Sequence, residues 1–236
     1  MNKRLVAVAL GVSGLLMATA PAAVAAPAAG TPSARDCGAV KLTGKLPVPP
    51  AGQTVRQTIT IGADCTAHEG PVTYTPVTYT PGAKPSAAKS PAAKSPAAES
   101  LTSARRITSA NEMYDCCNIR MTGLYTTSDW TAADGRITTA ATTATQGFNR
   151  EPWNAGWSLK SATAGSDCTT DCATVNTQAH ADFTYKGIFD TSGDWYANTH
   201  HTYLTLNPDL TYSCTFDVQL RHSFIGWNWQ RGCQAQ

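Results

Sequence analysis

The amino-acid sequence predicts an all-β protein. A disulfide-braced antiparallel β-sandwich or barrel-like domain is expected at the C-terminal end, preceded by a small β module and a linker. Three observations lead to this fold class. Apolar and polar residues alternate over several segments of the C-terminal half, short turn sequences rich in Gly, Pro, Asn and Asp separate those segments, and the chain contains eight cysteines.

The clearest alternation runs from Cys214 to Phe224, where every second residue is apolar or histidine and the residues between them are polar. This period of two is typical of a half-buried antiparallel strand. Residues 183–189 and 196–206 alternate as well, and each is followed by a turn sequence that contains Asp with Gly or Pro. Three successive strands joined by short turns predict a β-meander.

Other segments extend this pattern along the chain. A strand is expected at residues 55–61 because apolar residues alternate there. Further strands are expected at 118–126, 136–145 and 156–162, in a Thr-rich region with closely spaced turns. Only residues 103–113 have the spacing expected of a short helix. The strands outnumber that one helix, which favours a sandwich or barrel.

The first 25 residues have the features of a secretory signal peptide. Lys3 and Arg4 precede an apolar stretch, and Ala23 and Ala25 form a small-x-small cleavage site. The stretch is too short for a membrane span, so the mature protein is expected to be secreted and extracellular, without a span. Without Lys3 and Arg4 the basic and acidic residues balance, which argues against nucleic acid as a partner.

The remaining chain divides into three parts. Residues 81–105 are expected to be a flexible linker, because they contain an imperfect five-residue repeat of Pro, Ala, Lys or Glu, and Ser without large apolar side chains. Residues 31–80 before it predict a small β module, and residues 106–236 after it predict the β-rich disulfide domain. In composition the chain resembles exported proteins of high-GC Gram-positive bacteria.

All eight cysteines follow the predicted cleavage site, and an even number in an exported chain predicts disulfides. The linker leaves Cys37 and Cys65 as partners that close the small module. Among the other six, we expect the adjacent pair Cys116 and Cys117 to bond with Cys168 and Cys172, and Cys214 with Cys233. A redox role for residues 168–172 is the alternative, although their spacing exceeds that of a C-x-x-C motif.

The common catalytic and cofactor-binding sequences are absent: the mature chain has no H-E-x-x-H, G-x-S-x-G, P-loop or dinucleotide motif. No cofactor is therefore expected. The sequence favours a non-catalytic binding or structural protein of the bacterial exterior. The alternatives are a secreted hydrolase with an unrecognised site, with or without a metal ion, and a secreted inhibitor or toxin.

One group of residues could hold a metal ion. His180 and Asp182 fall on the polar face of their strand, and the following turn brings His201 near Asp182 with His180 diagonal to it. Two histidines and one carboxylate on one face can bind a divalent metal. The competing interpretation is an ordinary Asp–His pair on a solvated sheet face. His200 and His222 are interpreted as core or rim histidines.

Tryptophan suggests the ligand class. All six tryptophans lie in the C-terminal domain, several of them beside turns, and Trp227 and Trp229 share one face of a strand. Exposed indoles can stack on sugar rings, which makes cell-wall or environmental polysaccharide the expected partner. The competing interpretation is that these side chains fill the core. The candidate platform residues are Trp153, Trp157, Trp227 and Trp229.

Overall fold

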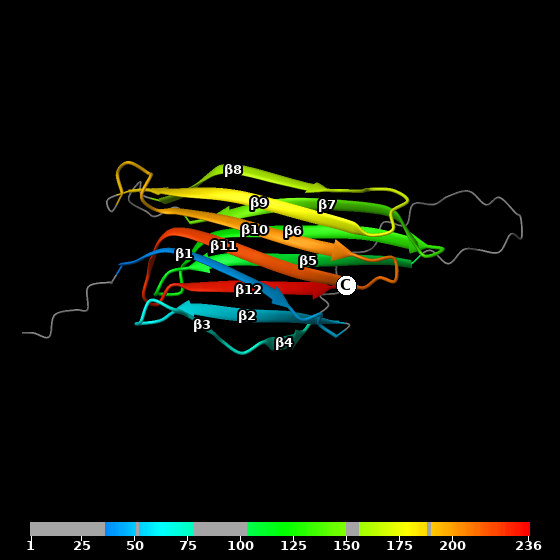
Figure 1. The fold of residues 1–236 in the computed structure, drawn as a ribbon, viewed down its shortest axis with the longest axis horizontal. Coiled ribbons are helices and arrows are strands. Elements are labelled where there is room, and N and C mark those ends of the chain that lie inside the picture. Colours follow the sequence, from blue (N-terminus) through cyan, green and yellow to red (C-terminus); the bar gives the residue numbers. More distant parts are fainter. Residues whose placement is uncertain (1–35, 51, 78–102, 150–155, 188–189) are drawn as a thin grey trace, which may run out of the picture. The chain divides into compact units, whose positions relative to one another are not determined.

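The computed structural model describes residues 36–50, 52–77, 103–149, 156–187 and 190–236, and in these residues the fold is all-β with two antiparallel sheets (Figure 1). Sheet A contains, in spatial order, β1 (Asp36–Leu46), β11 (Tyr212–Phe224), β10 (Ala197–Leu206), β9 (Val175–Lys186) and β8 (Gly156–Ser166). Sheet B contains β3 (Ala67–Glu69), β2 (Gln53–Ile61), β12 (Asn228–Ala235), β5 (Ser103–Tyr114), β6 (Arg120–Ala133) and β7 (Arg136–Phe148), and β4 (Thr73–Pro76) also pairs with β2.

The two sheets pack as a sandwich around one apolar core, so the sandwich form of the predicted fold class is confirmed. Strands β9, β10 and β11 alternate buried residues with more exposed ones over most of their length, as period-two patterning requires. The largest side chains that are fully buried between the sheets come from both of them; they include Trp130, Trp229, Phe183, Phe216 and Leu204. The hairpin of β10 and β11 has the expected register, with Leu204 opposite Cys214 and His200 opposite Val218.

The N-terminal segment is part of this sandwich. The sequence predicts a separate small module at 31–80, but β1 pairs with β11 in sheet A and β2 pairs with β12 in sheet B. Leu42, Val55 and Ile59 accordingly lie in the common core. The buried hydrophobic residues of this segment are too few for a core of their own, and pairing with the C-terminal strands buries them: Leu42, Leu46, Val55, Ile59 and Ile61.

The predicted helix at 103–113 is wrong, because these residues form strand β5. β5 lies between β12 and β6 and pairs with both along its length. Ile107, Ser109, Asn111 and Met113 face inward at every second position and are buried. A central position in a sheet supplies two sets of backbone hydrogen bonds, and this outweighs a weak local preference for helix.

Three disulfides are present in the described residues. Cys37–Cys65 and Cys214–Cys233 have the expected partners, and the second bond connects β11 of sheet A to β12 of sheet B. The expected bonds from Cys116 and Cys117 are wrong, because Cys168 bonds with Cys172.

The length of β6 explains this difference. Cys116 and Cys117 lie in the β5–β6 turn, whereas Cys172 pairs with Ile137, which lies opposite Ala132 at the other end of β6. Along β6, the distance from Arg120 to Ala132 at ~3.3 Å per residue is about 40 Å. Cys116 and Cys117 are free, exposed thiols with their Sγ atoms 3.8 Å apart.

A group of hydrogen-bonded polar side chains lies between the sheets. Asn111 Nδ2 donates to the backbone oxygens of His201 (2.8 Å) and Asp217 (3.0 Å). Asn111 Oδ1 accepts from His200 Nδ1 (2.9 Å) and Trp229 Nε1 (2.7 Å). All the hydrogen-bonding capacity of this buried amide is therefore used, and it connects β5 and β12 of sheet B to β10 and β11 of sheet A.

Arg231 is also buried between the sheets. Its Nη2 donates to Gln57 Oε1, and its guanidinium carbon lies 4.9 Å from the centroid of the Trp229 ring. Burial lowers the pKa of this guanidinium. A Cβ atom at position 44 would overlap the Arg231 guanidinium, so glycine lets β1 approach this buried side chain closely.

Some predictions concern residues outside the described ranges. These are the signal peptide at 1–25, Trp153, and the linker at 81–105 except for its last three residues, which belong to β5. Across the part of the chain that the structure describes, no helix is long and apolar enough to cross a membrane.

Candidate functional site

The outer face of sheet A carries three neighbouring rows of side chains, and their composition follows directly from the strand register. Each row crosses β8, β9, β10, β11 and β1. The middle row is Thr163, His180, His201, Asp217 and Thr43. The rows on either side are Ser161, Asp182, Thr199, Gln219 and Lys41, and Gly165, Gln178, Tyr203, Thr215 and Lys45.

The structure brings the predicted residues His180, Asp182 and His201 together. His180 lies directly opposite His201, and Asp182 lies opposite Thr199. This register differs by two residues from the predicted one, in which Asp182 faced His201. The reason is the long β9–β10 connection, since the paired segment begins only at Thr184 and Ala197.

Hydrogen bonds connect these side chains into a network that spans four strands, β8 to β11. His180 Nε2 donates to Asp182 Oδ2 (2.9 Å), and His180 Nδ1 lies 2.8 Å from His201 Nε2. His201 Nδ1 donates to Asp217 Oδ1 (2.6 Å). Ser161 Oγ donates to Asp182 Oδ2 (2.6 Å) at the other end. The two imidazoles therefore face each other, and each has a carboxylate on its far side.

Asp182 is held in its ionised form. Partial burial by itself raises the pKa of this carboxyl, but hydrogen bonds from Ser161, Thr199 and His180 bring the pKa down to about 2. The Thr199 hydroxyl donates to Asp182 Oδ1 at 2.7 Å. An ionised carboxylate can only accept hydrogen bonds, so the nitrogen of His180 that contacts it must carry a proton.

A buried side chain, Asn111, fixes the strands that carry these hydrogen-bonded residues. The carbonyl groups that Asn111 binds belong to His201 and Asp217, the residues whose side chains interact on the outer face. A buried amide with all its hydrogen bonds made holds β10 and β11 at one register at this point. The outer residues are thus supported by rigid strands and not by loops.

An exposed aromatic ring borders the two histidines. The Tyr203 side chain is on the outer face, 37% of the residue is exposed, and its ring is nearly parallel to that of His201 with centroids 6.0 Å apart. A shallow depression of ≈ 460 Å³ begins beside Tyr203. Its polar lining comes from the ends of β8, β9 and β10: Ser166, Asp167, Asn176, Gln178 and Thr205.

The predicted tryptophan platform is wrong. Trp229 is fully buried because it occupies an inward position of β12, between β2 and β5. Trp157 and Trp227 are 5% and 8% exposed and pack against other aromatic rings. These indoles therefore belong to the core, as the competing interpretation held. The exposed tryptophan among the described residues is Trp195. The centroid of its ring lies 4.0 Å from the centroid of the His222 ring.

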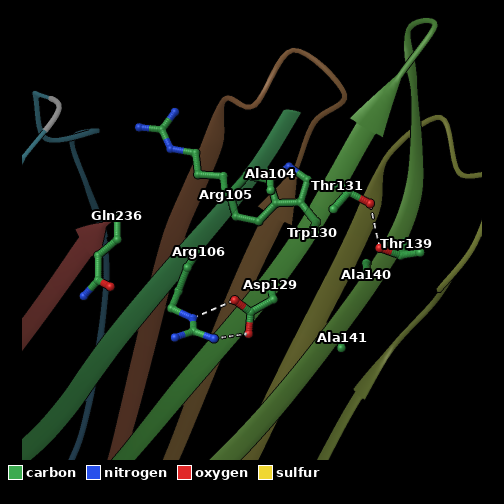
Figure 2. Close-up of a pocket in the computed structure, with 10 residues that line it drawn as sticks. All are labelled: Ala104, Arg105, Arg106, Asp129, Trp130, Thr131, Thr139, Ala140, Ala141 and Gln236. Carbon is green, nitrogen blue, oxygen red and sulfur yellow. Dashed lines mark hydrogen bonds and ion pairs between the residues drawn. The ribbon is translucent and has the colours of Figure 1, made fainter. Parts of the chain in front are cut away.

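A second depression, of ≈ 650 Å³, lies on the outer side of sheet B over β5, β6 and β7 (Figure 2). Three charged side chains line it. Arg106 donates to both carboxylate oxygens of Asp129 on the facing strand, at 2.6 and 3.1 Å, and Arg105 donates to the backbone oxygen of Leu210. Trp130 at its base is almost fully buried. This depression therefore has fewer exposed groups that could contact a ligand than the outer face of sheet A, where an aromatic ring and polar groups are exposed together.

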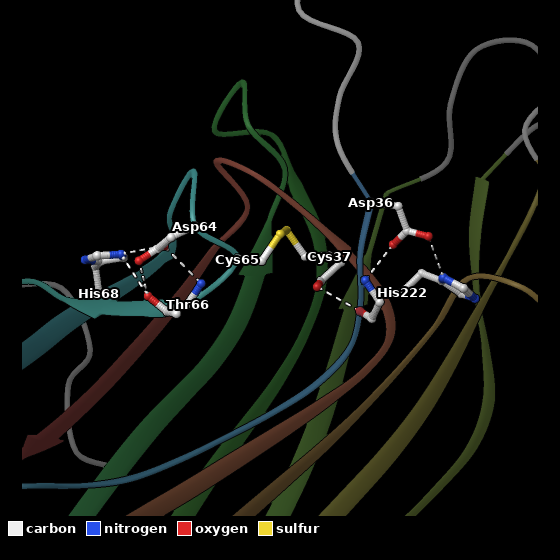
Figure 3. The surroundings of a disulfide bond; sticks show 9 residues. Asp36, Cys37, Asp64, Cys65, Thr66, His68 and His222 are labelled. Atoms are coloured by element: carbon white, nitrogen blue, oxygen red, sulfur yellow. Dashed lines mark hydrogen bonds and ion pairs between the residues drawn. A yellow bond between two sulfur atoms is a disulfide. The ribbon is translucent and has the colours of Figure 1, made fainter.

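The other histidines occur singly. His68 contacts Asp64 and Thr66, and His222 contacts Asp36, near the Cys37–Cys65 disulfide (Figure 3). His200 is buried, with Nδ1 donating to Asn111 and Nε2 accepting from Thr122 at 2.8 Å. Among the five histidines of the chain, only His180 and His201 hydrogen-bond to each other.

Sequence reasoning missed Asp217, Tyr203 and Asn111. The first two could have been found: the expected hairpin register already places His201 opposite Asp217, and Tyr203 alternates with the buried leucines of β10. Asn111 could not, because its role depends on contacts between two sheets that no local pattern records.

The chain gives no significant match to any protein-family model, to any curated protein or to any solved structure. The geometry of sheet A is therefore the basis for a functional proposal.

Proposed function

We propose that this is an exported bacterial protein that acts outside the cell as a non-catalytic binding protein, with polysaccharide as its ligand and the outer face of sheet A as its contact surface. The observation that carries the proposal is the exposed Tyr203 ring beside a depression with a polar lining. Sugar-binding sites combine a flat aromatic surface, which covers the C–H face of a ring, with amide and carboxylate groups that bind hydroxyls.

Two further observations support the proposal. Three disulfides brace the sandwich, and such bonds persist in oxidising, extracellular surroundings. One form of the alternative, a hydrolase that uses a side-chain nucleophile beside His180, Asp182 and His201, needs a hydroxyl or thiol that a histidine can deprotonate. The nearby hydroxyl of Ser161 donates to Asp182 and is not bonded to either histidine, which favours binding over catalysis.

Replacing Tyr203 with alanine is expected to weaken retention on polysaccharide about tenfold, because the variant loses one stacking surface, worth about 1.4 kcal/mol at that ratio. The measurement is depletion of the protein by insoluble cellulose, chitin and purified bacterial cell wall. The matched control is Tyr74→Ala, since Tyr74 is as exposed as Tyr203 but lies on β4 in sheet B. Absence of wild-type retention on all three polymers, or equal retention of both variants, would overturn the proposal.

A further inference from the structure

We propose that His180 Nδ1 and His201 Nε2 together form a binding site for one divalent transition-metal ion. This site lies on the same face as the proposed polysaccharide surface but does not depend on polysaccharide binding. It also differs from the site that the sequence predicts, because Asp182 supports a histidine and is not itself a ligand.

Proton positions lead to this conclusion. Asp182 and Asp217 each accept a hydrogen bond from a histidine, so the proton of each ring is on the nitrogen that faces its carboxylate: Nε2 of His180 and Nδ1 of His201. In a neutral ring the other nitrogen then carries a lone pair. These two remaining nitrogens are only 2.8 Å apart. Two lone pairs at this distance repel, so a cation between them is required, either a proton or a metal ion.

The separation of the nitrogens matches the span of a metal ion. With metal–nitrogen distances of ~2.0–2.1 Å, two ligands at an angle of ~90–110° are about 2.9–3.4 Å apart. The observed 2.8 Å therefore needs to open by only a few tenths of an ångström. Rotation of two ring planes accommodates such a shift, and the side chains of His180 and His201 are 29% and 22% exposed, so an ion can reach them.

The surroundings are those of a metal-binding histidine pair. Histidines that bind metals commonly donate their second N–H to a carboxylate, which fixes the tautomer and makes the ligand more basic. Here both histidines do so. Asp182 is itself fixed by Ser161 and Thr199, and the strands that carry His201 and Asp217 are fixed by Asn111. A lone surface histidine pair has no such second layer.

The donor set also predicts which metal is preferred. In the described residues no group of three or more His, Cys, Asp or Glu side chains could hold a metal ion, so the chain supplies two ligands and leaves the other positions to water or an external ligand. Two ligands give modest affinity, and for imidazole nitrogens the order of affinity is expected to be Cu²⁺ above Ni²⁺ and Zn²⁺.

The test is isothermal titration calorimetry of the untagged full chain with Cu²⁺, Ni²⁺ and Zn²⁺, after alkylation of the free thiols Cys116 and Cys117. One ion is expected to bind per chain. His180→Gln and His201→Gln are each expected to weaken binding at least tenfold. His68→Gln, which removes a single histidine paired with Asp64, is expected to leave it unchanged.

Two results would overturn the proposal. The first is no saturable binding of any of the three ions, which would assign the cation between the rings to a proton alone. The second is binding that His180→Gln and His201→Gln leave intact. Circular dichroism of each variant checks that the sandwich is still folded. Retention on polysaccharide is measured separately, so failure of the metal site and failure of the proposed function are distinguishable.

Discussion

Trp229→Ala is expected to lower the free energy of unfolding by about 3–5 kcal/mol, as large-to-small changes of fully buried aromatic residues do. The indole is entirely inaccessible and occupies the centre of sheet B. Its loss would leave a cavity, remove one of the two donors to Asn111 Oδ1 and leave the Arg231 guanidinium without the ring over which it lies. Urea unfolding of the oxidised protein measures the difference.

Trp229→Phe is the matched control for this prediction. It keeps a ring in the core but removes the N–H donor, so it separates packing from the hydrogen bond to Asn111. We expect a loss smaller than that of the alanine variant. Changes at exposed positions stay within about 0.5 kcal/mol. A loss of that size for Trp229→Ala would mean that the indole is on the surface, which would contradict the fold.

Stability is expected to fall by as much as about 1.4 kcal/mol per pH unit below pH 6.5 because of His200 alone. Burial is the main cause that lowers the pKa of His200 in the folded protein from 6.5 to about 3, with a smaller effect from His201. The folded state thus keeps this imidazole neutral while the unfolded chain takes up a proton. The contribution is complete above pH 6.5 and is lost progressively as the pH falls towards 3.

Unfolding midpoints in urea at several pH values between 7 and 4 test this prediction. The control is His222→Gln, since His222 is partly exposed on the rim. His200→Gln is expected to lower the free energy of unfolding at pH 7, because it disturbs Asn111 and Thr122. Below pH 6.5 that free energy should fall less steeply for the variant than for wild type, by up to about 1.4 kcal/mol per pH unit. Equal slopes for wild type and His200→Gln would show that the histidine is not buried as a neutral ring.

Much of the fold could be predicted from local patterns. Alternation in β9, β10 and β11 indicated the meander, and the turn at 207–210 indicated the register of its second hairpin. The same register places His201 opposite Asp217, so that pair was within reach of the sequence. The register of the β9–β10 hairpin was predicted wrongly by two residues, although the expected group of His180, Asp182 and His201 still lies on one face. These features succeed because a strand face and a short hairpin are fixed by residues adjacent in the chain.

Apart from the register of the β9–β10 hairpin, the wrong predictions have one cause in common: contacts between segments that are distant in the chain. β5 became a strand because β6 and β12 lie on both sides of it. Trp229 lies in the core because β12 is an inner strand of sheet B, paired with β2 on one edge and with β5 on the other. β2 comes from the segment that the sequence assigned to a separate module. The partner of Cys168 depended on the ends at which the long strands turn.

The most direct test of the proposed arrangement is a long-range ¹H–¹⁵N spectrum of the histidine side chains, recorded on metal-free protein at about pH 8. The arrangement predicts a proton on Nε2 of His180 and on Nδ1 of His201, with Zn²⁺ shifting the signals of the other nitrogen in each ring. A proton on Nε2 of His201 in its neutral form, with no response to Zn²⁺ at either ring, would contradict the account.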